Sequence, residues 1–354
     1  MSEPCVCVTG VGGGGFGEQI LKALRCARGP YRIVAADMTE QSSGFSLAHI
    51  AAALPAASAP DYVDSLLDLC GRHHIQAVLP GSEPELFVLA RHAMKFRDAG
   101  VFLPVCPSDV LTLCADKATL FARLKSLGFH VPWFAGISAL PDLEALSVFP
   151  LVFKPTTASG GSADVFIVQD RMEAEVFGAY LLRYRGEFVA QEYVGTAEDE
   201  YTVGVLRDME GNFIGSVALH RTLKPSLSRR IKVPNRTGRA ELGEYLAISS
   251  GISQGTLGMY PEICGPCAEM ARSIGTTGPI NVQCRFVGGK VHVMEINPRF
   301  SGTTSIRAMG GFNEPDLLLR RHFKGEAPIM PRIVPLTVLR RLEEVVCEDS
   351  MKYQ

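Results

Sequence analysis

The sequence of 354 residues lacks any apolar run that approaches the roughly 18 residues of a membrane-spanning helix. Its first segment, MSEPCVCVTG, lacks the basic and apolar regions of a secretion signal. Neither charge is in excess, with 35 basic against 37 acidic residues, so we expect no nucleic-acid or membrane partner. The ten cysteines follow no regular framework, which predicts reduced thiols in a cytoplasmic protein.

Short apolar runs alternate with helical segments in the first third of the chain. CVCVTG, RIVAAD, QAVLPG and VFLPV each end in turn residues, and this order predicts parallel strands joined by crossover helices. We therefore expect a doubly wound α/β sheet over residues 1–111. Strands with a glycine-rich connection predict a small α+β lid over 112–192, and longer antiparallel strands predict a core unit over 193–354.

The segment INVQCRFVGGKVHVMEIN predicts a hairpin with one polar and one apolar face. The polar face appears if Gln283 lies opposite Glu295, because side chains alternate along a strand. This register requires an odd-length connection, Gly288–Lys290, whereas a two-residue turn would place the two side chains on opposite faces. In that register the polar face carries Asn281, Gln283, Arg285, Glu295 and Asn297, and the apolar face carries Val282, Cys284, Phe286, His292, Met294 and Ile296.

Oxygen ligands on adjacent strands suit Mg²⁺, with Mn²⁺ as an alternative, so Gln283, Glu295 and Asn297 are the predicted metal ligands. The alternative interpretation is a solvent-facing strand with incidental polar residues. Arg299 and the SGTTS loop favour the metal site, because cations and hydroxyls suit an acyl phosphate. Candidate substrate contacts in and after this loop are Ser301, Thr303 and Arg307.

Lys154 closes the predicted strand PLVFKP, where a lysine can meet phosphates. The following run, Ser159, Gly160, Gly161 and Ser162, would let backbone amides approach them, although a flexible hairpin tip is the alternative. The run does not match a P-loop. Lys117 is a weaker second cation, since most such lysines are solvated helix residues. Farther along, QEYV contributes Gln191, Glu192, Tyr193 and Val194 as candidate adenine contacts, and Glu200 could bond ribose hydroxyls.

Taken in order, these segments resemble the ATP-grasp superfamily, and most closely one synthetase unit of the carbamoyl phosphate synthetase large subunit. The resemblance covers nearly the whole chain, and its most specific part is NVQ followed by EINPR. The segments that carry it are DK (116–117), VFKP…SGGS (152–162), QEYVGTAEDEYTV (191–203), NVQ (281–283) and MEINPR (294–299).

The resemblance implies a pre-ATP-grasp domain, a lid and a core. It implies that Lys117 and Lys154 contact ATP phosphates and that Arg299 stabilises the transferring phosphoryl group. The implied reaction is phosphorylation of a small carboxylic acid by ATP, followed by capture of the acyl phosphate by an amine, with release of ADP and phosphate. A carbamoyl- or carboxy-phosphate-forming synthetase that uses bicarbonate and ammonia is the alternative, and we keep a homodimer as one alternative for its assembly.

Two local motifs favour a third class, a dinucleotide-binding or redox protein. TGVGGGGFG, followed by Asp37, imitates a dinucleotide fingerprint, although the resemblance instead places this loop, including Gly13, beside a substrate. Cys264 and Cys267 form a redox-like CGPC, for which helix packing is the preferred interpretation. Ser82 and Glu83 follow a predicted parallel strand, where open sheets bind ligands. The basic stretch Arg229–Arg236 is either a loop over an anionic substrate or a solvated face.

Overall fold

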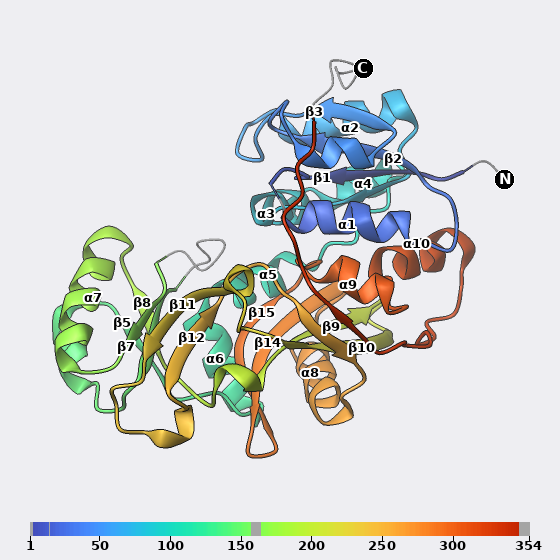
Figure 1. Cartoon of the computed structure of the whole chain (residues 1–354). Coiled ribbons are helices and arrows are strands. Elements are labelled where there is room, and N and C mark those ends of the chain that lie inside the picture. The colour runs from blue at the N-terminus through green and yellow to red at the C-terminus, as the bar shows by residue number, and fades with distance from the viewer. Residues whose placement is uncertain (1–2, 14, 157–163, 347–354) are drawn as a thin grey trace.

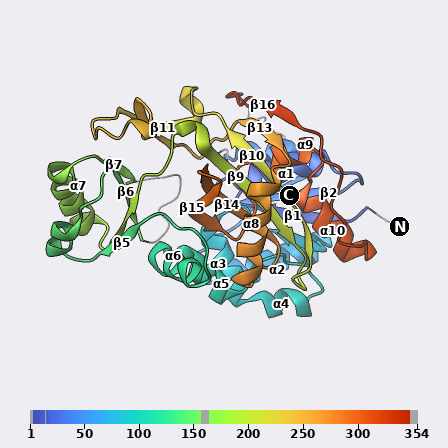
Figure 2. The same ribbon diagram turned by 90° about the horizontal axis from the view of Figure 1, so that it is seen from below.

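The structure is a computed structural model that describes residues 3–13, 15–156 and 164–346. In Figure 1 a parallel sheet lies above an antiparallel core sheet, and a smaller sheet extends to one side of the core. Seen from below (Figure 2), α6 (Lys117–Ser126) lies between the smaller sheet and the rest of the molecule. None of the described helices is long and apolar enough to cross a membrane.

The N-terminal unit is a four-stranded parallel sheet in the order β3-β2-β1-β4. Alternate residues of β1 pack on opposite sides: Val6 and Val8 join α1, while Cys5 and Cys7 join α2. Helices therefore cover both faces, which confirms the predicted doubly wound sheet. The elements are β1 (Cys5–Thr9), α1 (Phe16–Arg25), β2 (Arg32–Asp37), η1 (Ser43–Leu47), β3 (Ile50–Ala53), α2 (Tyr62–His73), β4 (Ala77–Leu79), α3 (Glu83–Arg91) and α4 (Ala93–Asp98).

A small antiparallel sheet, in the order β5-β8-β6-β7, forms the second unit. Its core includes Phe153, Phe188 and Leu181, which join the sheet to α7. The boundaries at 111 and 192 stay predictions, since α5 crosses residue 111 and β8 ends at Glu192. The elements are α5 (Ser108–Ala115), β5 (Phe134–Ile137), η2 (Leu140–Ala145), β6 (Leu151–Pro155), β7 (Phe166–Val168), α7 (Arg171–Tyr184) and β8 (Phe188–Glu192).

The core is a six-stranded sheet in the order β15-β14-β9-β10-β13-β16, with α8 on one face and α9 and α10 on the other (Figure 1). A separate hairpin, β11–β12, packs against the small sheet. The elements are η3 (Ala197–Asp199), β9 (Glu200–Arg207), β10 (Phe213–Arg221), η4 (Ser226–Ser228), β11 (Arg229–Pro234), η5 (Ala240–Leu242), β12 (Tyr245–Ser249), β13 (Gly255–Gly258), α8 (Pro261–Ser273), β14 (Pro279–Val287), β15 (Lys290–Asn297), α9 (Thr304–Met309), α10 (Glu314–Lys324) and β16 (Leu336–Val338).

The hairpin β14–β15 pairs Gln283 with Glu295 as the sequence predicted, but the turn and the strand geometry that produce this pairing differ from the prediction. Val287 pairs with Lys290, so the turn is the two-residue Gly288-Gly289 and the predicted odd-length connection is wrong. The register shifts after Gln283, where β15 contains one extra residue that forms a bulge. With the two-residue turn alone, Gln283 would not pair with Glu295, and the bulge restores this pairing.

The bulge also changes the faces of β15. Val291 and Val293 are the buried residues that join the apolar core, whereas His292 and Met294 line the cavity described below. Their predicted place on the apolar face was therefore wrong, because the extra residue inverts the alternation before Glu295.

Three glycines bring β1, α1 and the loop after β4 into close contact. A Cβ atom on Gly81 would lie 2.0 Å from the Thr9 carbonyl oxygen, and one on Gly17 would lie 2.2 Å from the Gly10 carbonyl oxygen. Gly10 itself has a φ of +58°. The glycine-rich start of the chain is therefore required for backbone packing at the sheet's carboxyl edge.

We predict that Gly81→Ala lowers the free energy of unfolding by about 2 kcal/mol or more, because the new methyl group meets rigid backbone. The matched control is Gly71→Ala in α2, where a Cβ atom meets nothing within 4 Å. Removing a helix-interior glycine there should stabilise the protein by up to about 1 kcal/mol. Urea unfolding checks both values, and equal effects would contradict the packing argument.

Candidate active site

A cavity of about 230 Å³ lies where the small sheet, the core sheet and the N-terminal unit meet. Each unit contributes: β6 and β8 from the small sheet, β9, β14 and β15 from the core, and the start of α3 from the N-terminal unit. The predicted site residues that line it are Glu83, Lys117, Lys154, Gln191, Glu192, Tyr193, Val194, Glu200, Gln283, Glu295, Arg299, Ser301 and Thr303.

Lys154 extends from the end of β6 to the edge of the core sheet. Its Nζ donates to the Gln191 Oε1 atom at 2.6 Å and to the Met294 carbonyl oxygen at 2.9 Å. Both acceptors are neutral. Burial, reinforced by the nearby Lys117 and only partly opposed by Glu295, lowers the pKa of Lys154 to about 7. Lys154 is therefore a buried cation whose charge lacks a close anionic partner among the described residues.

Lys117 lies at the first turn of α6, which begins where Asp116 caps the helix by accepting the Thr119 N–H at 3.0 Å. Its Nζ lies 3.8 Å from the Glu295 carboxylate. The helix is attached to the small sheet, because the Lys117 N–H donates to the Thr156 carbonyl oxygen at 3.2 Å. The two predicted phosphate-binding lysines thus approach Glu295 from different elements.

The three predicted metal ligands occupy neighbouring register positions. Gln283 and Glu295 are paired and line the cavity, while Asn297 pairs with Asn281 two residues along. Asn297 is buried just outside the lining, and its Nδ2 atom has no hydrogen-bond partner among the described residues. Amide and carboxylate oxygens therefore gather at one end of the hairpin, as the metal prediction requires.

The predicted adenine contacts are held by neighbours that sequence reasoning missed. The Glu192 carboxylate accepts from Arg239 at 3.1 Å, and the Tyr193 hydroxyl donates to the Ala247 carbonyl oxygen at 3.2 Å. The Val194 carbonyl oxygen accepts from Arg285 at 3.0 Å.

Glu200, the predicted ribose contact, is almost fully buried between two arginines. Its carboxylate oxygens lie 3.1 Å from Arg221 Nη1 and 3.4 Å from Arg285 Nη2. Sequence reasoning placed Arg285 on the polar strand face but gave neither arginine a role. The alternation of β14 could have identified Arg285, whereas Arg221 at the end of β10 carried no local signal.

Another ion pair in the cavity lining joins the N-terminal unit to the core. Arg299 Nη2 donates to the Glu83 carboxylate at 2.8 Å, and its guanidinium lies 4.6 Å from the centre of the Phe16 ring. Beside this pair, the Ser301 and Thr303 hydroxyls lie 2.7 Å apart. A carboxylate, a guanidinium and two hydroxyls therefore belong to the same cavity lining.

The structure does not bring all the candidates into the lining. Ser82 hydrogen-bonds Glu85 at 2.7 Å, and Gly13 lies in the loop before α1; neither lines the cavity. The predicted glycine-serine loop, Ser159, Gly160, Gly161 and Ser162, lies outside the described residues.

Arg307 is fully buried beneath the sheet rather than facing the cavity. It donates to Glu314 Oε1 at 3.1 Å and to Asn281 Oδ1 at 2.6 Å. Thr202 donates to the same Asn281 oxygen at 2.7 Å. The expected direct substrate contact is not seen, because the pairing of Arg307 with Glu314 directs the guanidinium into the interior.

A family profile described as "PylC-like, N-terminal domain" matches residues 11–104, and one described as "ATP-grasp in the biosynthetic pathway with Ter operon" matches residues 248–344. The carbamoyl phosphate synthase large chain of Thermomicrobium roseum is 26% identical over 211 residues. Together these matches support an ATP-grasp ligase. The match to the Thermomicrobium roseum protein covers 58% of this chain but only 18% of that protein's length.

Solved structures share the ATP-grasp fold. An L-amino acid ligase from Bacillus licheniformis has a TM-score of 0.62 at 17% identity, over 91% of this chain and 74% of that one. The N5-carboxyaminoimidazole synthetase from Staphylococcus aureus complexed with ADP has a TM-score of 0.63 at 15% identity, over 93% and 80%. At such identities the likeness establishes the fold, and it confirms the predicted pre-ATP-grasp, lid and core architecture.

In this chain the two competing motifs have structural roles. The Asp37 carboxylate accepts the Gly12 N–H at 2.8 Å and the Thr39 N–H at 3.1 Å, so it holds the glycine loop rather than facing a ribose. Cys264 and Cys267 are buried on α8, and a hydrogen bond with Cys284 together with burial raises the pKa of Cys267 well above its usual value. Neither arrangement favours a dinucleotide or redox function.

We predict that Lys154 makes nucleotide binding depend on pH. As the pH rises through about 7, the free protein loses the Lys154 charge, whereas bound phosphates favour the charged form. The ATP association constant, measured by calorimetry without divalent cation, should fall about tenfold per pH unit above 7. Lys154→Arg stays charged and should lack this fall; the same slope in both proteins would contradict the assignment.

Arg307→Ala should lower the free energy of unfolding by about 3–5 kcal/mol, because it leaves the Glu314 carboxylate buried without its cation. The comparison variant is Arg341→Ala, at an exposed arginine, which should change stability by less than about 0.5 kcal/mol. Urea unfolding measures both. An unchanged stability in Arg307→Ala would contradict the buried-pair assignment.

Proposed function

We propose that this chain is an ATP-dependent carboxylate–amine ligase that works through an acyl phosphate and releases ADP and phosphate. The observation that carries the proposal is one cavity whose lining holds two chemically different groups of residues. Lys117, Lys154 and the hairpin residue Glu295 suit phosphates and a metal ion, and the ion pair of Glu83 with Arg299 lies in the same lining. The matched relative's activity is not carried over, because this chain spans under a fifth of its length.

The residues present fit a nucleotide polyphosphate. Lys154 contacts only neutral acceptors within the described residues, and a buried ammonium without a counterion favours binding an anion. Val152, Ile248 and Met294 supply apolar lining between the small sheet and the core. Gln191, Glu192, Tyr193 and Val194 would hold the base at the connection between the two sheets, and Glu200 is proposed for the ribose.

Residues of the β14–β15 hairpin fit a divalent cation that also takes oxygens from phosphates. Among the described residues no three Asp, Glu, His or Cys side chains gather into a metal site. The proposed site therefore combines one carboxylate with amide oxygens. Glu295, Gln283 and Asn297 supply that mixed set of oxygens at neighbouring register positions of the hairpin. When bound, Mg²⁺ would neutralise charge on the transferring phosphoryl group.

The chain's own residues would then position the acid and exclude water. Arg299 would hold the substrate carboxylate. An oxygen of this carboxylate would bond to the γ-phosphorus of ATP while the bond between that phosphorus and the ADP oxygen breaks. The amine nitrogen would next bond to the acyl carbon, with loss of phosphate as the leaving group and of one amine proton to solvent or phosphate. Positioned cations perform this chemistry without a protein nucleophile.

The residues around Arg299 suggest a class of substrate. Glu83 and Arg299 carry opposite charges and are hydrogen-bonded to each other at 2.8 Å, next to the Ser301 and Thr303 hydroxyls. An α-amino acid carries a carboxylate and an ammonium on one carbon. Its carboxylate could pair with Arg299 and its ammonium with Glu83, in place of the ion pair between these two side chains. We therefore favour an amino acid as the acid substrate, with bicarbonate and ammonia as the competing pair.

The test is ADP release from ATP and Mg²⁺ with paired L-amino acids, or with bicarbonate and ammonium. Glu295→Gln removes the negative charge at nearly constant volume and should lower ADP release at least about 100-fold. The control is Glu269→Gln, at an exposed α8 carboxylate paired with Arg272, which should leave the rate unchanged.

Retained activity in a folded Glu295→Gln protein would remove this residue from the proposed metal site. Release with bicarbonate and ammonium alone would favour the carboxy-phosphate alternative. No release with any pair would overturn the ligase proposal, provided that the circular-dichroism spectrum shows a folded protein.

A further inference from the structure

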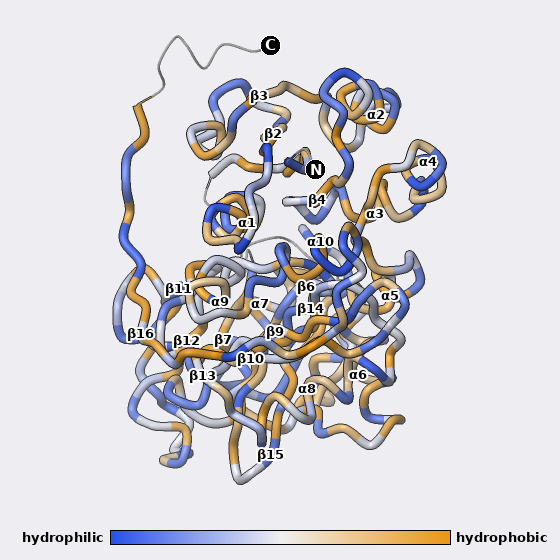
Figure 3. The backbone as a smooth tube through the Cα atoms, turned by 90° about the vertical axis from the view of Figure 1, so that its right-hand side faces the viewer, coloured by the Kyte–Doolittle hydropathy of each residue, from blue (hydrophilic) through white to orange (hydrophobic). Residues whose placement is uncertain are grey.

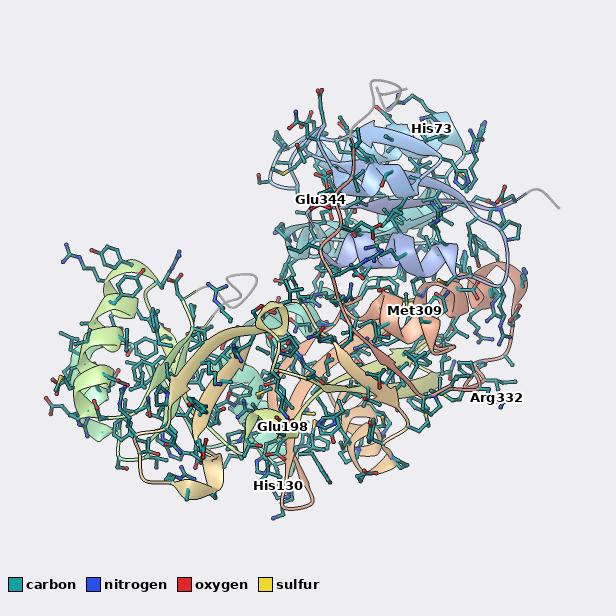
Figure 4. The ribbon with its side chains drawn as sticks, viewed as in Figure 1. His73, His130, Glu198, Met309, Arg332 and Glu344 are labelled. Atoms are coloured by element: carbon teal, nitrogen blue, oxygen red, sulfur yellow. The ribbon has the colours of Figure 1, made fainter. Side chains whose placement is uncertain are left out.

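The last described segment of the chain, residues 326–346, crosses the whole molecule. Its strand β16 pairs antiparallel with β13, so that Leu336 faces Leu257 and Val338 faces Gly255 at the edge of the core sheet. Figure 3 shows the chain continuing from β16 past the outside of the N-terminal unit, and in Figure 4 Glu344 lies beside that unit. The segment therefore connects the core edge to the far end of the protein.

One residue of this segment, Arg340, reaches inward. Its backbone N–H donates to Gln254 Oε1 at 3.0 Å, and its Nη1 donates to Gln19 Oε1 at 2.7 Å. Its Nε donates to the Ser253 carbonyl oxygen at 3.3 Å, and its Nη2 donates to the Gly302 carbonyl oxygen. A single planar guanidinium thus joins α1, the loop before β13 and the loop after Arg299.

The two carbonyl acceptors belong to the cavity wall. Ser253 and Gly302 both line the cavity, and Gly302 lies between the two hydroxyl residues proposed for the acid substrate. Gln19 also contacts the helix that follows this loop, since Ser305 in α9 donates to its Oε1 atom at 2.6 Å. The position of the 301–303 loop therefore depends on a contact from a residue nearly 40 positions farther along the chain.

We propose that Arg340 is a positioning residue that orients the 301–303 loop for the acid substrate. It lies behind the wall and holds two carbonyl oxygens there, so that the hydroxyls of Ser301 and Thr303 keep one arrangement toward the cavity. The role in substrate binding rests on the proposed ligase function, whereas the anchoring of the loop does not.

The neighbouring Arg341 provides a matched control. Its side chain is exposed, and its recorded ion pair is with the exposed Glu343 at 3.7 Å. Arg340→Gln and Arg341→Gln make the same chemical change one residue apart, so nonspecific loss of positive charge affects both. Arg340→Lys keeps the charge but cannot serve three separate acceptors with one planar fork.

The first experiment is amide hydrogen exchange on the full chain without ligand. In Arg340→Gln, peptides spanning residues 300–306 should exchange at least about tenfold faster than in the parent, while peptides from β14 and β15 should not change. Arg340→Lys should give an intermediate rate and Arg341→Gln the parent rate. Equal exchange in Arg340→Gln and Arg341→Gln would overturn the anchoring role.

The second experiment uses the L-amino acid that gives the fastest ADP release with the parent protein. Arg340→Gln should raise the KM for that acid about tenfold or more and leave the KM for ATP within about twofold, because most residues proposed for the nucleotide lie on β6, α6 and β8. Equal rises in both constants would show a general structural defect and overturn the positioning role. If the parent releases no ADP with any pair, the ligase proposal fails, but the exchange result still decides whether Arg340 anchors the loop.

Discussion

The site depends on the junction between the small sheet and the edge strand of the core. An edge strand exposes backbone carbonyl groups that need partners, and β15 is the edge strand next to β14. Lys154 and Gln191, from adjacent strands β6 and β8, donate to the Met294 and Val293 carbonyl oxygens. The bulge in β15 makes two consecutive carbonyls available, so the small sheet is attached where the proposed phosphate and metal ligands meet.

The distribution of charge explains why this junction can accept an anion. Four carboxylates line the cavity, and each is close to a cation; the pairs are Glu83–Arg299, Glu192–Arg239, Glu200–Arg221 and Glu295–Lys117. Lys154 is different, because its contacts are neutral oxygens and burial lowers its pKa. A buried cation whose nearest acceptors are neutral costs free energy in the free protein, and a bound phosphate would offset that cost.

Two motifs show how tertiary structure changes the meaning of a local pattern. The glycine run and Asp37 have the spacing of a dinucleotide site, yet the carboxylate caps the loop's own N–H groups. Cys264 and Cys267 have redox spacing, yet their helix places both thiols in the core against Cys284, where burial disfavours the thiolate. The same spacing is compatible with both uses, and only the partners of the side chains distinguish them.

The predicted Gln283–Glu295 pairing agrees with the structure only because the bulge compensates for the two-residue turn. The sequence alone was sufficient for the order of the three units, because apolar runs and turn residues are local signals. It could not reveal the route to that register, since a bulge and a turn change the pairing in equivalent ways. Nor could it reveal Glu83 beside Arg299 or Gln19 beside Arg340, which are 216 and 321 positions apart. Such pairs form only when separate units pack together, and no local spacing records which side chains will meet.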